Sequence, residues 1–159
     1  MNTTHQEPRG FELQRELAAS PEELFETLTS PDRQRQWLSA LGAEAGKVET
    51  SIDLRVGGSW ESTFCATPEV TVHDVWTFRE VDAPHRIVAD LISESSMSGV
   101  STPPLHSSIT LTFDSIAAGT LLSVTHTGFP SDEALAFFAN VVWPGAISRM
   151  SEFTAKVQS

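Results

Sequence analysis

Residues 53–64 read DLRVGGSWESTF, and this stretch decides how the middle of the chain folds. Apolar and polar residues alternate on both sides of Gly57 and Gly58, which is typical of strands with one buried face. Glycine weakens the interior of a strand, so two in a row mark a turn, a bulge or a close approach of another group to the backbone. The stretch therefore predicts two strands or one interrupted strand.

The same alternation continues on both sides of this stretch, with glycine and proline between the segments. Residues 10–19 predict a first strand, and six more follow at residues 48–56, 59–66, 70–81, 86–94, 107–113 and 120–129. Residues 114–120 have the length of a hairpin connection, which requires antiparallel neighbours. Residues 95–105, SSMSGVSTPPL, predict a longer polar and mobile loop, because prolines cannot join a strand ladder.

Helix signals appear at two places in the chain. Ser20 and Ser30 each precede a proline and acidic residues, which predicts two short helices at residues 20–28 and 30–38. Residues 131–157 have helical spacing, and Pro144 predicts a kink or break between Asn140 and Gly145. The order of elements indicates an α+β fold in which a long C-terminal helix covers an antiparallel sheet.

Length and charge limit the classes of function. The 159 residues fit one domain, residues 1–159, with an ordered core at about 9–157. The formal net charge is −11 and the basic residues are scattered, so we expect no nucleic-acid partner and no membrane partner. A single cysteine, Cys65, and an N-terminus without a secretion signal predict a reducing, cytoplasmic location.

Several segments together resemble a known family. Residues 20–38, 53–60, 78–88 and 119–129, followed by Trp143, are similar to bacterial homologues of the activator of the heat-shock-protein-90 ATPase. That family belongs to the START-like (SRPBCC) helix-grip superfamily. The resemblance implies a curved seven-stranded antiparallel sheet around a long C-terminal helix, with two short helices between strands 1 and 2. It also implies a cavity for a small apolar molecule, and a tight hairpin at Gly57 and Gly58.

The chain departs from the family pattern at two tryptophans. Val142 precedes Trp143 where relatives carry Gly-Trp, and Pro144 follows it. Trp76 stands where relatives often have a small residue, so its indole is expected to narrow or reshape the cavity.

Histidine chemistry finds little support in the sequence. His73 and Asp74 are adjacent on a strand, so their side chains lie on opposite faces and cannot act as a pair. His126 shares a strand face with apolar residues, which favours a structural hydrogen bond. A catalytic role for His126 is the alternative. The spacing of the histidines predicts no metal site, and Cys65 has no local base. No cofactor is expected.

Asp74 is the acidic residue of most interest. It shares a strand face with Val72, Trp76 and Phe78. It therefore lies either inside the cavity, where it can orient a ligand or accept a proton, or at an exposed edge or mouth. Ordinary core packing is the alternative for each aromatic residue. The predicted ligand-binding residues are Trp60, Asp74, Trp76, Phe78, Leu111, Phe113, Val124, His126, Trp143 and Ile147.

The leading interpretation is non-catalytic binding of a small hydrophobic or aromatic molecule between the sheet and the C-terminal helix. The first alternative is a polyketide cyclase, lyase or hydrolase that uses Asp74 or His126, and this rests on analogy of fold. The second is an interaction protein that stimulates a chaperone ATPase. A homodimer formed through sheet edges or the loop at residues 95–105 is a further expectation.

Overall fold

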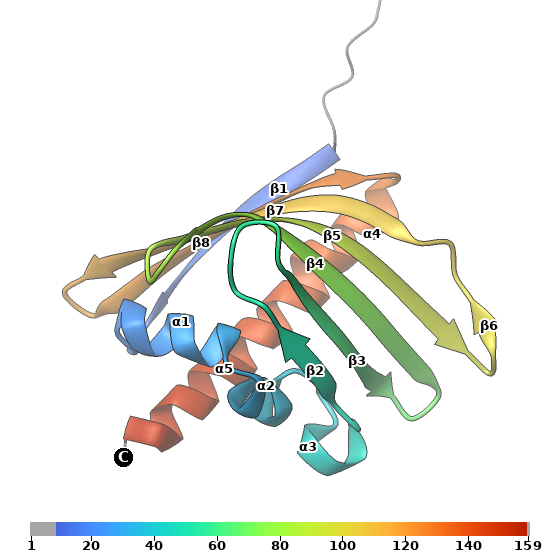
Figure 1. Cartoon of the computed structure of the whole chain (residues 1–159), viewed down its shortest axis with the longest axis horizontal. Coiled ribbons are helices and arrows are strands. Elements are labelled where there is room, and N and C mark those ends of the chain that lie inside the picture. The colour runs from blue at the N-terminus through green and yellow to red at the C-terminus, as the bar shows by residue number, and fades with distance from the viewer. Residues whose placement is uncertain (1–8, 159) are drawn as a thin grey trace, which may run out of the picture.

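The computed structural model describes residues 9–158, and its centre is a curved antiparallel sheet (Figure 1). Seven strands follow the order β1-β8-β7-β5-β4-β3-β2, and a two-residue strand, β6, pairs with β5. The predicted seven-stranded sheet is confirmed, with β6 as an addition. The strands are β1 (Arg9–Leu17), β2 (Glu49–Ile52), β3 (Ser59–Thr67), β4 (Val70–Asp82), β5 (Arg86–Met97), β6 (Val100–Ser101), β7 (Leu105–Ile116) and β8 (Gly119–Phe129).

Helices lie between β1 and β2 and after β8. The first group is α1 (Pro21–Thr29), α2 (Pro31–Trp37) and a four-residue helix that the sequence did not indicate, α3 (Gly42–Ala45). The second group is α4 (Asp132–Phe137), the π-helical segment η1 (Phe138–Val142) and α5 (Trp143–Gln158). Ser20 caps α1 by accepting a hydrogen bond from the backbone N–H of Glu23 at 3.2 Å, as the Ser-Pro motif predicts.

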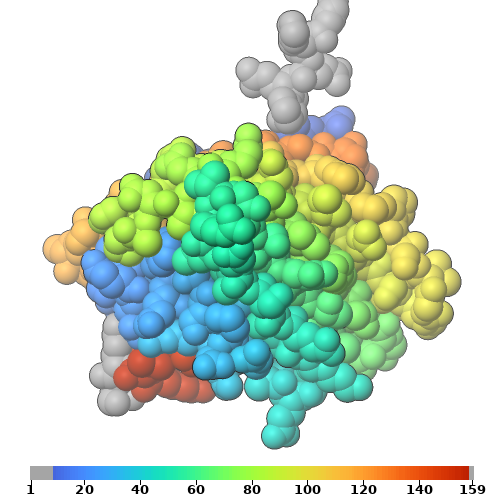
Figure 2. Space-filling model, viewed as in Figure 1, coloured from blue at the N-terminus to red at the C-terminus, as the bar shows by residue number. Residues whose placement is uncertain are grey.

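The helices cover one face of the sheet, which we call the inner face. Alternate residues of each strand point to it, and those near α1 and α5 form one buried hydrophobic cluster with the helices. Arg149 of α5 donates hydrogen bonds to the backbone oxygens of Trp37 and Leu38, at 2.7 and 3.3 Å, and so ties α2 to α5. In Figure 2 the early helices, in blue, fill the side of the molecule between the β4–β5 turn, in yellow-green, and the end of α5, in red.

Gly57 and Gly58 lie in the connection between β2 and β3, which is a six-residue loop at residues 53–58 and not the tight hairpin expected at the two glycines. Gly57 has φ +84°, and a Cβ atom on Gly58 would lie 2.2 Å from the backbone oxygen of Asp53. The turn also joins β4, because Gly57 N–H donates to Phe78 O and Phe78 N–H donates to Gly58 O. Residues 53–58 form a loop, so β2 ends at Ile52 and is shorter than the predicted strand at residues 48–56.

The C-terminal helix accommodates Pro144 without a break. The irregularity predicted between Asn140 and Gly145 is the π-helical segment at Phe138–Val142, directly before α5. Proline lacks a backbone N–H, and one wide turn before it lets the helix continue past the missing hydrogen bond. Figure 1 shows α4, η1 and α5 as one continuous coil.

Residues 95–105 differ from the expected loop. β5 continues to Met97, the chain turns at Ser98 and Gly99, and Val100–Ser101 returns as β6. Thr102 adds hydrogen bonds to Ser95. The polar composition was therefore misleading, because serine and threonine can form a strand ladder as long as backbone partners are present. Pro103 and Pro104 lie outside the strands, as predicted.

Candidate functional site

Three tryptophans from three elements meet on the inner face. Trp60 of β3 and Trp76 of β4 are cross-strand partners with ring centroids 4.7 Å apart, and Trp143 of α5 lies edge-on to Trp76 at 6.4 Å. Each of the three residues is 3–6% exposed. Trp76 therefore packs between Trp60 and Trp143, and the narrowing of a cavity by its indole stays a prediction. Trp60 is fixed further by a 2.9 Å hydrogen bond from its Nε1–H to Thr50 Oγ1.

His126 is completely buried and holds Trp143 in place. Trp143 Nε1–H donates to His126 Nδ1 at 3.0 Å, and the Ser107 hydroxyl lies 2.8 Å from His126 Nε2. An indole nitrogen is only a donor, so Nδ1 must be the acceptor and the proton of the neutral ring is on Nε2. Burial lowers the pKa of His126 from 6.5 to about 4, so the ring is neutral near pH 7. Both nitrogens are occupied, which agrees with the structural interpretation of His126.

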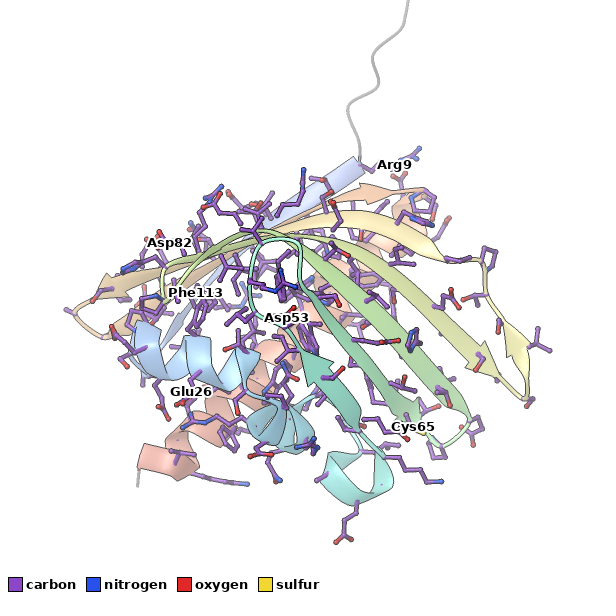
Figure 3. The ribbon with its side chains drawn as sticks, viewed as in Figure 1. Arg9, Glu26, Asp53, Cys65, Asp82 and Phe113 are labelled. Atoms are coloured by element: carbon purple, nitrogen blue, oxygen red, sulfur yellow. The ribbon has the colours of Figure 1, made fainter. Side chains whose placement is uncertain are left out.

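The other apolar residues of the predicted set lie deeper in the same cluster. Phe113 packs edge-on against Phe25 of α1, with centroids 5.4 Å apart (Figure 3). The fold therefore brings nine of the ten predicted residues together as buried neighbours, while the cavity that they were predicted to line stays a prediction. The remaining members of that buried set are Phe78, Leu111, Val124 and Ile147.

Asp74 differs from the other nine residues because it is partly exposed. Its cross-strand partners on the inner face are Ser62 of β3 and Ser93 of β5. Burial raises its pKa from 3.8 to about 6, and a hydrogen bond with Ser93 and the charge of His73 limit the rise. One carboxylate oxygen, Oδ1, is buried and has no hydrogen-bond partner. Asp74 thus lies at the edge of the aromatic cluster, one of the two places that the sequence allowed.

Beyond Asp74 the inner face is only partly covered, and we call this region the open end. It consists of Ser62, Phe64, Val72, Asp74 and Ser93, of which Ser62 alone is fully buried. Phe64 and Val72 are cross-strand partners, so they form a continuous apolar strip next to Asp74. In Figure 1 these parts of β3, β4 and β5 extend past α1, α2 and α5.

The sequence prediction of the site missed most of the open end. Ser62, Phe64, Val72 and Ser93 were not among the predicted ligand-binding residues. The signal was available, because period-two alternation places Ser62 and Phe64 on the face of Trp60, and Val72 on the face of Trp76. Only the pairing of β4 with β5 shows that Ser93 lies beside Asp74.

The outer face of the sheet carries His73 and Cys65. His73 lies within 3.1 Å of Glu61 and 2.8 Å of Thr63, so it faces away from Asp74, as predicted. Cys65 lies at the end of β3 farther from Asp53 (Figure 3), with its sulfur 4.0 Å from Thr71 Oγ1. Among residues 9–158, no three histidine, cysteine or acidic side chains converge as a metal site would require.

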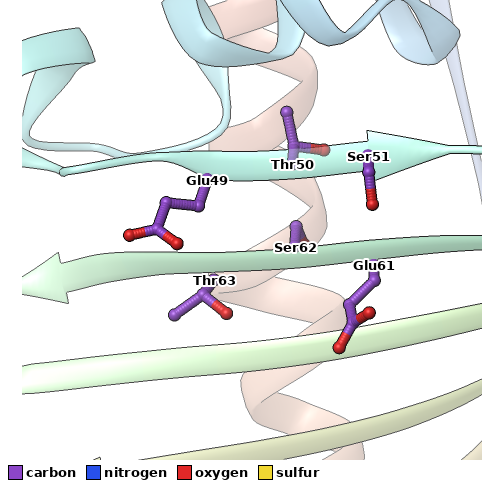
Figure 4. Close-up of a pocket in the computed structure, with 6 residues that line it drawn as sticks. All are labelled: Glu49, Thr50, Ser51, Glu61, Ser62 and Thr63. Carbon is purple, nitrogen blue, oxygen red and sulfur yellow. The ribbon is translucent and has the colours of Figure 1, made fainter.

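A groove of about 320 Å³ lies over β2 and β3 (Figure 4). The groove is separate from the ten predicted residues, and polar side chains line it. Glu49 lies beside Thr63, and Ser51 beside Glu61, as the strand register requires. An acidic, open groove of this kind is unsuited to an apolar molecule. Its lining is Glu49, Thr50, Ser51, Glu61, Ser62 and Thr63.

An antiparallel sheet of this order, closed on its apolar face by a long C-terminal helix and by short early helices, defines the START-like, helix-grip class of α+β proteins. A family model described as Activator of Hsp90 ATPase homolog 1-like protein matches residues 18–155. The chain therefore belongs to this family, and the resemblance noted from its sequence motifs is confirmed.

Solved structures share the fold at low sequence identity. Protein NE0264 from Nitrosomonas europaea has a TM-score of 0.70 and 15% identity, over 94% of this chain and 96% of that one. A putative uncharacterized protein from Rhizobium leguminosarum has a TM-score of 0.71 and 18% identity, over 94% and 96%. CalU16 from Micromonospora echinospora has a TM-score of 0.61 and 22% identity, over 92% and 76%.

No curated protein matches the chain. Of the helices within residues 9–158, none combines the length and apolar character needed to cross a membrane.

Proposed function

We propose that the protein binds a small aromatic or apolar molecule at the open end of its inner face, without converting it chemically. The observation that carries this proposal is the strip formed by Phe64 and Val72, which is apolar and partly exposed, with Phe64 packed against the buried cluster that contains the tryptophans. Binding sites for such molecules are concave and mostly apolar, with few polar groups that fix orientation. The START-like fold of the chain is consistent with this role.

The ligand body is expected to lie over Phe64 and Val72, with Trp76 behind it and Trp143 beside it. The tryptophans contribute a rigid wall, because hydrogen bonds fix Trp60 and Trp143 and both rings pack against other side chains. A rigid wall loses little conformational entropy when a ligand binds. The ten residues predicted from the sequence thus mostly support the site, and Asp74 belongs to it directly.

The enzymatic alternative is less well supported. A general acid or base must reach the substrate with a nitrogen or oxygen that is free to exchange a proton. Both nitrogens of His126 are bound to Trp143 and Ser107, and His73 is on the outer face. Asp74, whose Oδ1 has no partner, is therefore the only one of the two residues predicted for catalysis that keeps a free proton acceptor. Stimulation of a chaperone ATPase, which the family name suggests, stays a separate prediction that an ATPase assay with the cognate chaperone would test.

The experiment is a fluorescence titration with N-phenyl-1-naphthylamine, a neutral aromatic probe. Three of the four tryptophans form the aromatic cluster next to the open end, so saturable binding should raise probe emission and quench tryptophan emission together. Val72→Arg should weaken binding by about tenfold or more, because it places a charged side chain on the apolar strip. Val75→Arg, on the same strand but the outer face, is the matched control and should bind as the wild type does.

The proposal fails if the probe shows no saturable binding, or if the two arginine variants bind it equally well. Native mass spectrometry of protein purified from its own host offers an independent test. A small molecule retained by the wild type and lost in Val72→Arg would support the proposal.

A further inference from the structure

One buried hydrogen-bond acceptor at the open end has no partner in the described part of the chain. This atom is Asp74 Oδ1. In the described residues that are not exposed overall, it is the only buried side-chain nitrogen or oxygen atom without a hydrogen bond. Almost all buried polar atoms in folded proteins are paired, so an exception calls for a specific explanation. A partner that binds from outside the chain is one such explanation.

The neighbours of Asp74 do not fill this role. Ser93 donates one hydrogen bond to the carboxylate, and Ser62 lies opposite on the other side. His73 is next in sequence, but its side chain leaves from the other face and contacts Glu61 and Thr63. The carboxylate therefore has an oxygen that faces the inner side with no donor from either adjacent strand.

Charge on the inner face narrows the choice of ligand. The inner-face positions of β3, β4 and β5 carry no lysine or arginine, so the carboxylate of an acidic ligand would find no cation there and would meet Asp74. A ligand with a protonated amine would supply both a positive charge and a donor. Charge-assisted hydrogen bonds of this kind are shorter and stronger than neutral ones.

We infer that the molecule bound at the open end is an aromatic or apolar amine, whose nitrogen donates a hydrogen bond to Asp74 Oδ1 while its body covers Phe64 and Val72. This inference rests on the proposed function. The raised pKa of Asp74 agrees with it, because a carboxyl group that lacks a cationic partner in a partly buried site favours its neutral form. At pH 7.5, above this pKa, the group is ionised, and a bound ammonium group would stabilise that form.

Three probes that share one aromatic body test the inference: 2-naphthylmethylamine, 2-methylnaphthalene and 2-naphthoate. Their affinities are measured near pH 7.5 by displacement of N-phenyl-1-naphthylamine. We expect the amine to bind about tenfold more tightly than the methyl compound, and the carboxylate to bind most weakly. In Asp74→Asn the preference for the amine should disappear, while the affinity for 2-methylnaphthalene should stay within about twofold.

Glu94→Gln is the matched control, because it removes one negative charge from β5 on the outer face, opposite His73. It should keep the preference for the amine, and circular dichroism of each variant confirms folding. If the methyl compound binds but the amine gains nothing, or if Asp74→Asn keeps the gain, the inference is overturned and the proposed function stands. If no probe binds the wild type, both are overturned.

Discussion

Asp74→Asn should stabilise the protein in a pH-dependent way, because the wild type carries an unpaired carboxylate in a partly buried site. The pKa of Asp74 is raised from 3.8 to about 6, so the folded state favours the neutral form. The stability from this group is therefore fully present below about pH 3.8 and is lost as pH rises through about 6. This rise in the pKa of Asp74 corresponds to a loss of about 3 kcal/mol in the free energy of unfolding at high pH.

Asparagine cannot ionise, so the variant escapes this loss. The free energy of unfolding of Asp74→Asn minus that of the wild type should rise by about 2 kcal/mol between about pH 4.5 and about pH 7.5, which is most of the full effect. The melting temperature should rise by about 2–4 °C per kcal/mol for a chain of this length. Urea unfolding across this pH range measures the difference directly.

The wild type alone would hide the effect. The pKa of His126 is lowered to about 4, so its contribution is present above about pH 6.5 and lost as pH falls through about 4. The two groups thus give opposite slopes between pH 4 and 6, and only the difference between variant and wild type separates them. Asp114→Asn, an exposed carboxylate on the outer face of β7, controls for the loss of one charge. A difference that does not vary with pH would refute the reasoning.

Three further predictions concern the parts that support the site. The imidazole of His126 should remain neutral with its proton on Nε2 between about pH 5.5 and 8, so ¹⁵N NMR that detects the Nδ1–H form or a titration in this range would contradict the assignment. Ser107→Ala should reduce the free energy of unfolding by about 1–3 kcal/mol, since it leaves the Nε2–H of His126 without an acceptor, and a neutral result in urea unfolding would argue against that hydrogen bond. Gly99→Ala should lower the free energy of unfolding by about 1–2 kcal/mol, because Gly99 has a positive φ. Gly58→Ala should lower it by more, because the new methyl group meets the backbone oxygen of Asp53. Equal losses in the two variants would show that the turn at Gly58 can shift.

Much of the fold could be predicted because local patterns and burial agree in this chain. Alternation in residues 70–81 gave both the strand and the face on which Trp76 and Asp74 lie. The capping serine and proline gave the start of α1 at Pro21. Where the local pattern was weak the prediction failed, as in the β6 hairpin and in α3, which form through backbone pairing and packing that composition does not encode.

The site was harder to predict than the fold. Apolar residues at inward positions identify the interior, but they do not distinguish a lined cavity from a packed cluster. That distinction depends on where the covering helix ends, which leaves Phe64 and Val72 accessible and buries Trp60. The contacts among Trp143, His126 and Ser107 join residues 17 and 19 positions apart, and no local pattern predicts them.

Under the proposed function, the uneven cover of the inner face separates the residues that keep the protein folded from those that would contact a ligand. Changes at Trp60 or Trp143 disturb the interior on which every element depends. Changes at Val72 or Ser93 affect partly exposed positions at the open end, outside the buried cluster. Under the proposed function, substitutions at Phe64 or Val72 would change ligand preference while leaving the buried tryptophans in place.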